Sequence, residues 1–191
     1  MTTATRHRTR VTALAVAAAG LVTAPLALAS PASAATATYE IPAPSTPAAG
    51  VETSLLDPIT IGACNAGFGD VSVAPWETGI GHVDLFCGDD KSGYVHMRTG
   101  HQAQWQTVVD GAGGGAYRDD FMVFATGSMV TAPGPGFPKD EGDGKLCYSA
   151  PILIKNEEGN VVDTYNPTVI VSANNKKIIT SSPTHLVDNC G

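Results

Sequence analysis

The sequence predicts an α+β fold, in which N-terminal helices pack on a small C-terminal antiparallel β-meander that is stabilised by disulfides. Two stretches between residues 92 and 132 carry helical patterns of apolar residues. After Lys145 the pattern changes to an alternation with period two, which is typical of strands. Four cysteines are present, and an even number in an exported chain indicates two disulfides. Helices followed by strands, rather than alternating with them, favour the α+β class.

The first 34 residues have the pattern of an export signal. Three arginines precede a mostly apolar run from Val11 to Leu28, and the small residues of Ala32-Ser33-Ala34 form a cleavage pattern. Gly20 and Pro25 interrupt the run, and no stop-transfer pattern follows it. We therefore expect cleavage after residue 34, a secreted extracellular product, and no association with a membrane.

Residues 35–56 are rich in Pro, Ala and Thr, and residues 57–191 carry the mixed pattern of a folded chain. We expect a linker followed by a single secreted α+β domain. Loss of the signal leaves 157 residues and changes the net charge from −7 to −10, because the signal holds three arginines and no acid. Phosphate affinity depends mainly on Lys and Arg, so the acidic balance counts against a role in nucleic-acid binding.

The four cysteines, Cys64, Cys87, Cys147 and Cys190, all lie in the predicted domain. Three pairings into disulfides are possible, and sequence alone does not choose among them. The local pairing joins Cys64 to Cys87 and Cys147 to Cys190. No two cysteines stand at the short spacing that a structural zinc site usually needs. We therefore expect no metal and no other cofactor.

The first part of the domain is broken by glycines. Between Asp57 and Phe86 we expect short strands or loops packed around Cys64 and Trp76, at the three apolar segments 59–61, 71–73 and 83–86.

Two helices follow in the prediction. The first runs from Ser92, a candidate cap, to about Val109, and Gly100 weakens it enough to favour a break there. The second opens at Asp119 and Asp120 and ends before the segment Pro133-Gly134-Pro135-Gly136.

The last third of the chain predicts strands. Residues 146–155 alternate with period two and predict one extended segment. A turn at residues 158–160 separates it from the next extended run, which covers 161–165 and 168–173. A tight turn at Asn174-Asn175 then leads into a last strand over 176–180.

His96 and His101 are the first candidates for chemistry. Five residues on a helix correspond to a rotation of about 140°, which argues against a two-histidine helical metal site. If the helix breaks at Gly100, the two rings could still converge. The alternative is that each is a surface histidine or a satisfied core histidine. Lys177, Thr180 and Ser181, near the end of the chain, would gain a function only by facing these histidines.

The order of motifs resembles bacterial toxin and secreted nuclease domains of the barnase–EndoU–colicin–RelE group. The resemblance covers about half of the chain and lies in Cys87-Gly88-Asp89, Gly93-Tyr94, His96-Met97, His101, Trp105, residues 146–151, residues 159–165 and Ile178-Ile179-Thr180. Two positions differ from the group's pattern. Gly100 stands where an arginine precedes the second histidine, and Ser182 stands where an aromatic residue is expected.

This resemblance implies metal-independent cleavage of RNA, in which a ribose 2′-hydroxyl attacks the adjacent phosphate. Histidine suits both proton transfers because its ordinary pKa lies near neutrality. By position, the resemblance makes His96 and His101 the acid–base pair. It places Arg98 or Lys177 at the phosphate, with Thr180 and Ser181 as hydrogen-bond donors. RNA would be the substrate, a cognate immunity protein a further partner, and we expect a monomer.

Two other functions compete with this interpretation. One is a secreted interaction domain without catalytic activity, and a diverged, inactive relative of the nucleases belongs with it. The other is a protease inhibitor, because the stretch from Tyr165 to Val171 is similar to a late strand of small actinobacterial subtilisin inhibitors. The cysteine spacings here are wider than in those inhibitors, and no cysteine-bracketed reactive loop is evident.

Overall fold

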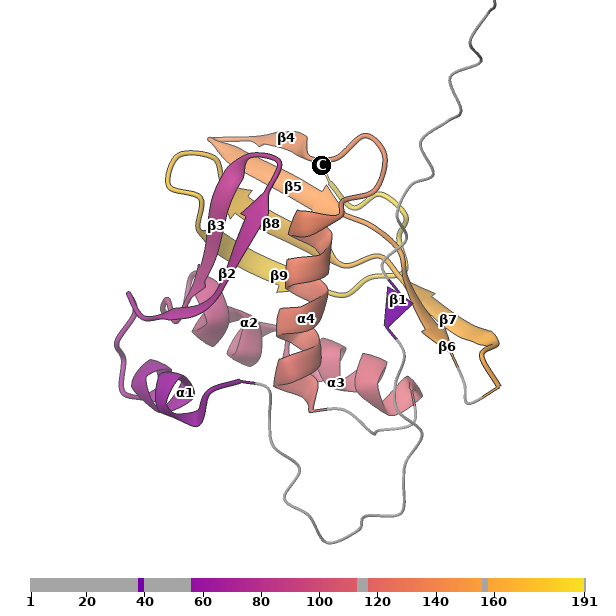
Figure 1. Ribbon diagram of the computed structural model, residues 1–191, viewed down its shortest axis with the longest axis horizontal. Helices are drawn as coiled ribbons and strands as arrows, with labels where there is room; N and C mark the ends of the chain where they lie inside the picture. Colours follow the sequence, from indigo (N-terminus) through magenta and orange to yellow (C-terminus); the bar gives the residue numbers. More distant parts are fainter. Residues whose placement is uncertain (1–37, 40–55, 113–116, 156–157, 191) are drawn as a thin grey trace, which may run out of the picture. The chain divides into compact units, whose positions relative to one another are not determined.

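The computed structural model describes residues 38–39, 56–112, 117–155 and 158–190. Within them, helices precede a four-stranded antiparallel sheet, which confirms the predicted α+β class with its C-terminal meander (Figure 1). The sheet has the strand order β4-β5-β8-β9. Its strands are β4 (Lys139–Gly142), β5 (Lys145–Ser149), β8 (Thr168–Ser172) and β9 (Ile178–Ser182).

The predicted signal peptide lies outside the described residues, as does the predicted linker apart from Leu56 and the short strand β1 (Thr38–Tyr39). β1 pairs in parallel with β6 (Ile152–Lys155), which also pairs with β7 (Val161–Tyr165). Among the described residues, no helix has both the length and the apolar character needed to cross a bilayer.

A helix occupies the segment 59–61, where a short strand or a loop is predicted. α1 (Pro58–Asn65) begins after Asp57, whose carboxylate accepts hydrogen bonds from the backbone N–H groups of Ile59 and Thr60 at 3.2 and 3.0 Å. A proline at the first helical position and a capping aspartate before it both favour helix over strand. The prediction of a strand or loop was wrong because it depended on the apolar residues and did not take this helix cap into account.

The other two predicted segments do form strands. β2 (Ser72–Thr78) and β3 (Gly81–Phe86) make an antiparallel hairpin, in which Trp76 pairs with Val83. The hairpin lies at the β9 edge of the four-stranded sheet, because the backbone N–H of Asp84 donates to the carbonyl of Lys176, just before β9, at 3.0 Å. β3 therefore lies beside the start of β9, although more than 90 residues separate them in the sequence.

The two predicted helices are both confirmed, and the first is broken as expected. It forms α2 (Gly93–Gly100) and α3 (Gln102–Gly111), with His101 between them. α4 (Arg118–Thr131) carries Asp119 and Asp120 in its first turn, where acidic groups favour the helix dipole. α4 packs against β2, β5 and β8, and α2 packs against β9 and β3 (Figure 1).

The single strand predicted over residues 146–155 is two strands in two different sheets. β5 ends at Ser149 and β6 begins at Ile152. At this junction the carbonyl of Ser149 accepts a hydrogen bond from the N–H of Gly134 at 2.8 Å, and Pro151 has no N–H to give to a ladder. The alternating pattern continues through the junction, and so the pattern alone did not reveal the change of sheet.

Both disulfides follow the local pairing. Cys64 on α1 is bonded to Cys87 after β3, and Cys147 on β5 is bonded to Cys190 near the end of the chain. The core consists of buried aliphatic, aromatic and sulfur-containing side chains, with Tyr94, Met97, Trp105, Met122 and Tyr148 among the most buried. The predicted stabilisation of the fold by two disulfides is confirmed.

Candidate functional site

The break between α2 and α3 brings the two histidines together. The ring centroids of His96 and His101 lie 5.6 Å apart, with the rings at 88° to one another. In one continuous helix these side chains would diverge. His101 instead has φ −119° and ψ 14°, which ends α2 at Gly100 and redirects the side chain. The convergence predicted for a broken helix is therefore present.

Hydrogen bonds fix the orientation of both rings. His96 Nδ1 lies 2.9 Å from the carbonyl oxygen of Asp90, and His101 Nδ1 lies 2.6 Å from Gln104 Oε1. Both partners are acceptors, so in each neutral ring the proton sits on Nδ1 and Nε2 is the basic nitrogen. His101 Nε2 then accepts from the hydroxyl of Thr180 at 3.2 Å. Within the described part of the chain, His96 Nε2 has no hydrogen-bond partner.

The loop before α2 holds His96 in place and depends on two glycines. Gly88 has φ +66°, and a Cβ there would lie 1.9 Å from the carbonyl oxygen of Ser92. Gly93 has φ +80°, and a Cβ there would lie 2.7 Å from the carbonyl oxygen of Phe86. The Asp89 carboxylate closes the turn by accepting from the N–H groups of Lys91 and Ser92. This closed turn sets the position of the Asp90 carbonyl and hence of the His96 ring.

Trp105, on α3 just after the two histidines, connects this helix to β9. Its indole is fully buried, and Nε1 donates to the carbonyl of Ser181 at 3.2 Å. This bond sets the first turns of α3 against the last strand, and so it holds Thr180 within reach of His101. The Ser181 side chain is itself fully buried, and its hydroxyl has no partner among the described residues. Ser181 therefore does not belong to the surface site, whereas Thr180 does.

Arg98 lies away from the histidine pair. Its guanidinium carbon is 5.4 Å from the centre of the Tyr94 ring, one turn earlier on α2. His96, two residues from each, points in the opposite direction on the helix. The Tyr94 hydroxyl donates to Asp119 at 2.7 Å, and Asp119 pairs with Arg118 at 2.6 Å. Burial, and then the bond to Asp119, raise the pKa of Tyr94 above its ordinary value.

Lys177 is also held apart from the histidines. Its ammonium group lies 4.4 Å from the centre of the Phe86 ring and 3.6 Å from the Asp70 carboxylate. It lines a pocket of about 290 Å³, together with Asp89 and several glycines. Neither predicted phosphate ligand, Arg98 or Lys177, contacts the two histidines.

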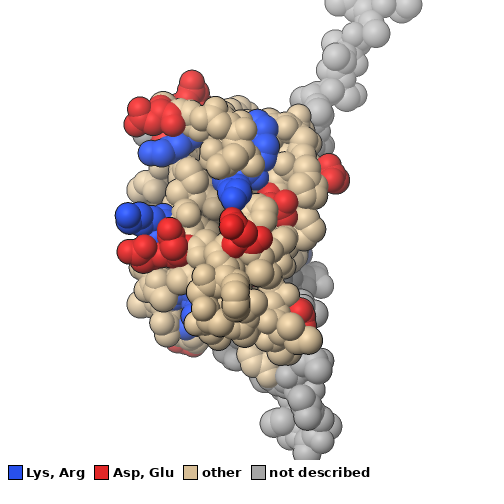
Figure 2. Space-filling model, turned by 90° about the vertical axis from the view of Figure 1, so that its left-hand side faces the viewer, with Lys and Arg blue, Asp and Glu red and all other residues tan. Residues whose placement is uncertain are grey.

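The surface charge is mixed. Figure 2 shows Lys and Arg side chains next to Asp and Glu side chains on the face that lies at the left of Figure 1, without a continuous basic area. A groove for nucleic acid usually has clustered positive charge. This face would therefore attract RNA only weakly.

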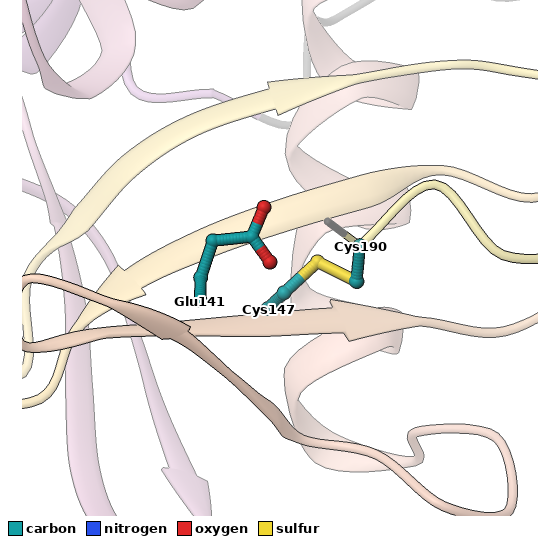
Figure 3. Close-up of side chains that lie close together, drawn as sticks. All are labelled: Glu141, Cys147 and Cys190. Carbon is teal, nitrogen blue, oxygen red and sulfur yellow. A yellow bond between two sulfur atoms is a disulfide. The ribbon is translucent and has the colours of Figure 1, made fainter.

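One group of possible metal ligands is accounted for by a disulfide. Glu141, Cys147 and Cys190 have ligand atoms within 4.8 Å of one another. Figure 3 shows the two sulfur atoms bonded to each other beside the carboxylate of Glu141. A disulfide sulfur is not the thiolate that binds metal, so in this oxidised state the group is a structural crosslink.

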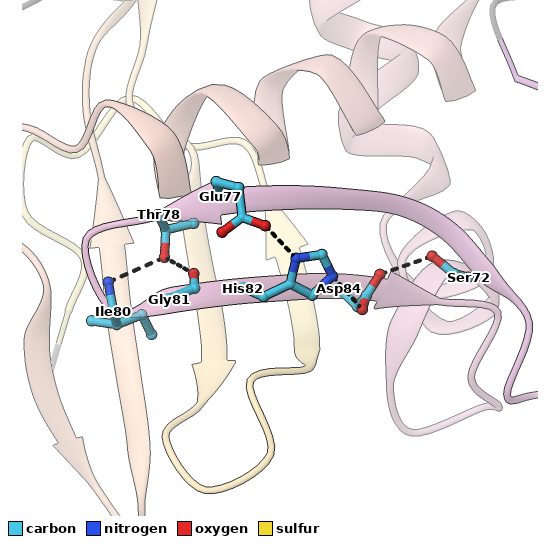
Figure 4. Close-up of polar contacts among 7 residues, drawn as sticks. All are labelled: Ser72, Glu77, Thr78, Ile80, Gly81, His82 and Asp84. Atoms are coloured by element: carbon cyan, nitrogen blue, oxygen red, sulfur yellow. Dashed lines mark hydrogen bonds and ion pairs between the residues drawn. The ribbon is translucent and has the colours of Figure 1, made fainter.

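The hairpin carries a second polar cluster that the sequence reading missed. His82 lies between two carboxylates, with Nδ1 2.7 Å from Glu77 and Nε2 3.1 Å from Asp84 (Figure 4). Ser72 donates to the other oxygen of Asp84 at 2.8 Å. The hydrogen bond with Glu77, and then the charges of the acids, raise the pKa of His82. The signal in the sequence that could have predicted this cluster is the turn at residues 79–80, because a hairpin around that turn places Glu77 opposite His82.

Comparison with known proteins finds relatives of part of the chain. No family model matches the sequence. Two uncharacterised proteins of Mycobacterium tuberculosis, from strains CDC 1551 / Oshkosh and ATCC 25618 / H37Rv, are each 31% identical to it over 103 residues. The match covers 52% of this chain and 35% of each relative, so the chain spans about a third of the length of these relatives. The chain is therefore similar to a portion of larger mycobacterial proteins.

Proposed function

We propose that the protein is a secreted RNase-like domain and that His96 and His101 form its acid–base pair. The observation that carries the proposal is the meeting of two oriented imidazole rings, 5.6 Å apart, beside the hydroxyl of Thr180. Two groups that exchange protons with one substrate must lie within a few ångströms of each other. The same motifs resemble the barnase–EndoU–colicin–RelE group, in which RNA is cleaved without a metal.

The orientation of the rings suggests how the steps divide. His96 Nε2, which is unprotonated in the neutral ring, takes the proton of a ribose 2′-hydroxyl. The 2′-oxygen then forms a bond to the adjacent phosphorus, and the bond from phosphorus to the 5′-oxygen breaks. His101, in its protonated form, gives a proton to that leaving oxygen and leaves a 2′,3′-cyclic phosphate. In the protonated ring, the Nε2–H of His101 donates to Thr180 Oγ1, which positions the ring. This hydrogen bond is exchanged for one to the leaving 5′-oxygen when the proton is transferred.

Export of the protein is part of the same proposal. The two disulfides support it, because disulfides persist mainly in oxidising compartments outside the cytosol. The N-terminal sequence of protein recovered from culture medium tests the predicted cleavage after Ala34.

The central experiment incubates the purified protein with labelled single-stranded RNA in EDTA. We expect cleavage products that end in a 2′,3′-cyclic phosphate, and a loss of about 100-fold or more in rate for His96→Ala and for His101→Ala. His82→Ala is the matched control, since that histidine lies on the β2–β3 hairpin and should leave the rate unchanged. Absence of cleavage by the wild type would support a non-catalytic interaction domain instead. Equal rates of cleavage in all three variants would show that His96 and His101 are not the catalytic pair.

A gain-of-function variant tests whether weak RNA binding limits this activity. A Cβ at Gly100 would lie 3.6 Å from His96 Cε1, an ordinary contact, so a side chain fits beside the pair. Gly100→Arg restores the arginine of the resembled motif, and we expect a severalfold higher kcat/KM with a steeper dependence on salt. Gly100→Gln controls for side-chain length without charge. An equal response to both variants would argue against electrostatic binding of RNA at this point.

A further inference from the structure

Gln104 follows His101 by one turn, at the start of α3. Its side-chain oxygen lies 2.6 Å from His101 Nδ1, and the other ring nitrogen, Nε2, lies 3.2 Å from the hydroxyl of Thr180. His101 occupies the N-cap position of α3, but its side chain makes no capping bond to the backbone of the helix. The two ring nitrogens are therefore engaged by side chains from two different elements, α3 and β9.

The two partners of the His101 ring differ in their effect on its proton. A neutral imidazole has one N–H, and the hydrogen bonds made by its two nitrogens determine which nitrogen carries it. The hydroxyl of Thr180 can donate or accept, so it suits either form of the ring. In the structure the amide of Gln104 turns its oxygen toward Nδ1, and that oxygen only accepts. Gln104 therefore selects the ring form with the proton on Nδ1.

The backbone that carries this contact is held from the core. The N–H of Trp105 donates to the carbonyl of His101 at 3.1 Å, which closes the first turn of α3. The indole of Trp105 is fully buried and donates to the carbonyl of Ser181. His101 and Gln104 thus project from one fixed helical turn, and only the side-chain torsions of Gln104 need to be ordered for the bond to form.

We propose that Gln104 is a positioning residue, which keeps the proton of neutral His101 on Nδ1 and leaves Nε2 to face the substrate. Its role in catalysis rests on the proposed RNase activity, in which the protonated ring gives the proton on Nε2 to the leaving oxygen. The neutral ring that remains then carries its proton on Nδ1. Gln104 accepts from this same N–H before and after the transfer, so the ring does not have to turn.

The first test measures the position of the proton in the purified protein without RNA. Ring-nitrogen chemical shifts of ¹⁵N-labelled protein at about pH 9, where histidine is ordinarily neutral, distinguish the two forms of His101. We expect the Nδ1–H form in the wild type and in Gln104→Glu, which keeps an accepting oxygen. Gln104→Met keeps the length of the side chain without the oxygen. It should raise the ratio of the Nε2–H to the Nδ1–H form about fivefold, the effect of one neutral hydrogen bond.

Gln106 on the same helix provides the matched control. Its side chain is also exposed, and it bonds to Asp110 at 2.8 Å rather than to a histidine. Gln106→Met makes the same chemical change two residues away and should leave the proton of His101 on Nδ1.

The second test measures RNA cleavage by the same variants. Because Gln104 contacts the histidine, we expect Gln104→Met to lower kcat about fivefold with KM unchanged. Gln104→Glu should restore kcat, and Gln106→Met should change neither constant.

Three results would overturn the proposal. The first is a wild-type His101 with its proton on Nε2, because the amide of Gln104 would then face the ring with its N–H groups. The second is equal behaviour of the ring in Gln104→Met and Gln106→Met. The third is a changed proton position with an unchanged kcat, which would remove the role in catalysis. If the wild type cleaves no RNA, the proposed function fails, and the chemical shifts alone decide whether Gln104 holds the ring.

Discussion

At the scale of single residues, His82 shows how local charge sets a proton affinity. Glu77 faces it across the hairpin, Asp84 lies two residues along the same strand, and both carboxylates meet the ring (Figure 4). The protonated ring donates to both carboxylates, whereas the neutral ring has only one N–H to donate. Folding therefore favours the charged form, and this is why the pKa of His82 is raised.

The stability of the protein should depend on pH through this residue. Because the folded pKa lies above the ordinary value of about 6.5, the folded state binds more protons near neutrality. The contribution of His82 is full below that ordinary value and is lost as the pH rises through the folded pKa. We expect the urea midpoint to fall over this window in the wild type and to fall less in His82→Gln.

NMR titration of the His82 ring measures the cause directly. Glu77→Gln should lower the pKa of His82 more than Ser72→Ala does, since Glu77 is the largest contributor. An unchanged His82 pKa in Glu77→Gln would contradict this account.

At the scale of secondary-structure elements, α4 and β2 pack closely because one helical residue has no side chain. A Cβ at Gly127 would lie 2.4 Å from Trp76 Nε1 and 2.5 Å from Trp76 Cε2. The indole of Trp76 thus rests on the backbone of α4. Glycine inside a helix is unfavourable by about 1 kcal/mol relative to alanine, and here this close approach offsets the cost.

We expect Gly127→Ala to lower the free energy of unfolding by about 1–3 kcal/mol, because the added methyl overpacks the contact with Trp76. Gly62→Ala is the matched control on α1, where a Cβ would have no atom within 4 Å. That variant should be neutral or slightly stabilising, because alanine favours the helix. Urea denaturation measures both, and equal effects would show that Trp76 does not rest on Gly127.

At the scale of the whole molecule, the two disulfides fasten different parts of the chain. Cys64–Cys87 spans 23 residues and anchors the loop that leads to His96, while Cys147–Cys190 spans 43 residues and fastens the C-terminal segment to β5. A disulfide stabilises chiefly by restricting the unfolded chain, and the effect grows slowly with the length of the loop. The two bonds should therefore contribute similar stability.

Removing either pair with alanines should lower the free energy of unfolding by about 3–4 kcal/mol, slightly more for the longer loop. Loss of Cys64–Cys87 should reduce the proposed RNA cleavage more than loss of Cys147–Cys190 does, because only the first bond anchors the loop that leads to His96. Chemical denaturation and the RNA cleavage assay measure these outcomes on the same proteins. Equal loss of cleavage in both variants would show that the disulfides act only on global folding.

Much of the fold was predictable from local patterns. The helix break at Gly100, the helix opened by Asp119, and the change to strands after Lys145 each depend on residues near one another in the sequence. Local residues also explain α1, the described helix that was not predicted. Asp57 and Pro58 form a helix start, and this start outweighs the strand preference of residues 59–61 that follow. The alternation that continues on both sides masked the change of sheet at Ala150–Pro151, although Pro151, which has no N–H for a ladder, was a local signal of it.

The sequence by itself determined the α+β class and the pair of histidines whose rings a helix break would bring together. Only the tertiary structure decided which predicted residues share a site. Thr180 reaches His101 because Trp105 bonds to β9 across 76 residues, whereas Ser181, the next residue, is buried in the core. Arg98 and Lys177 are held by Tyr94 and Phe86 instead. Such contacts depend on how distant segments pack, and no local pattern encodes that packing.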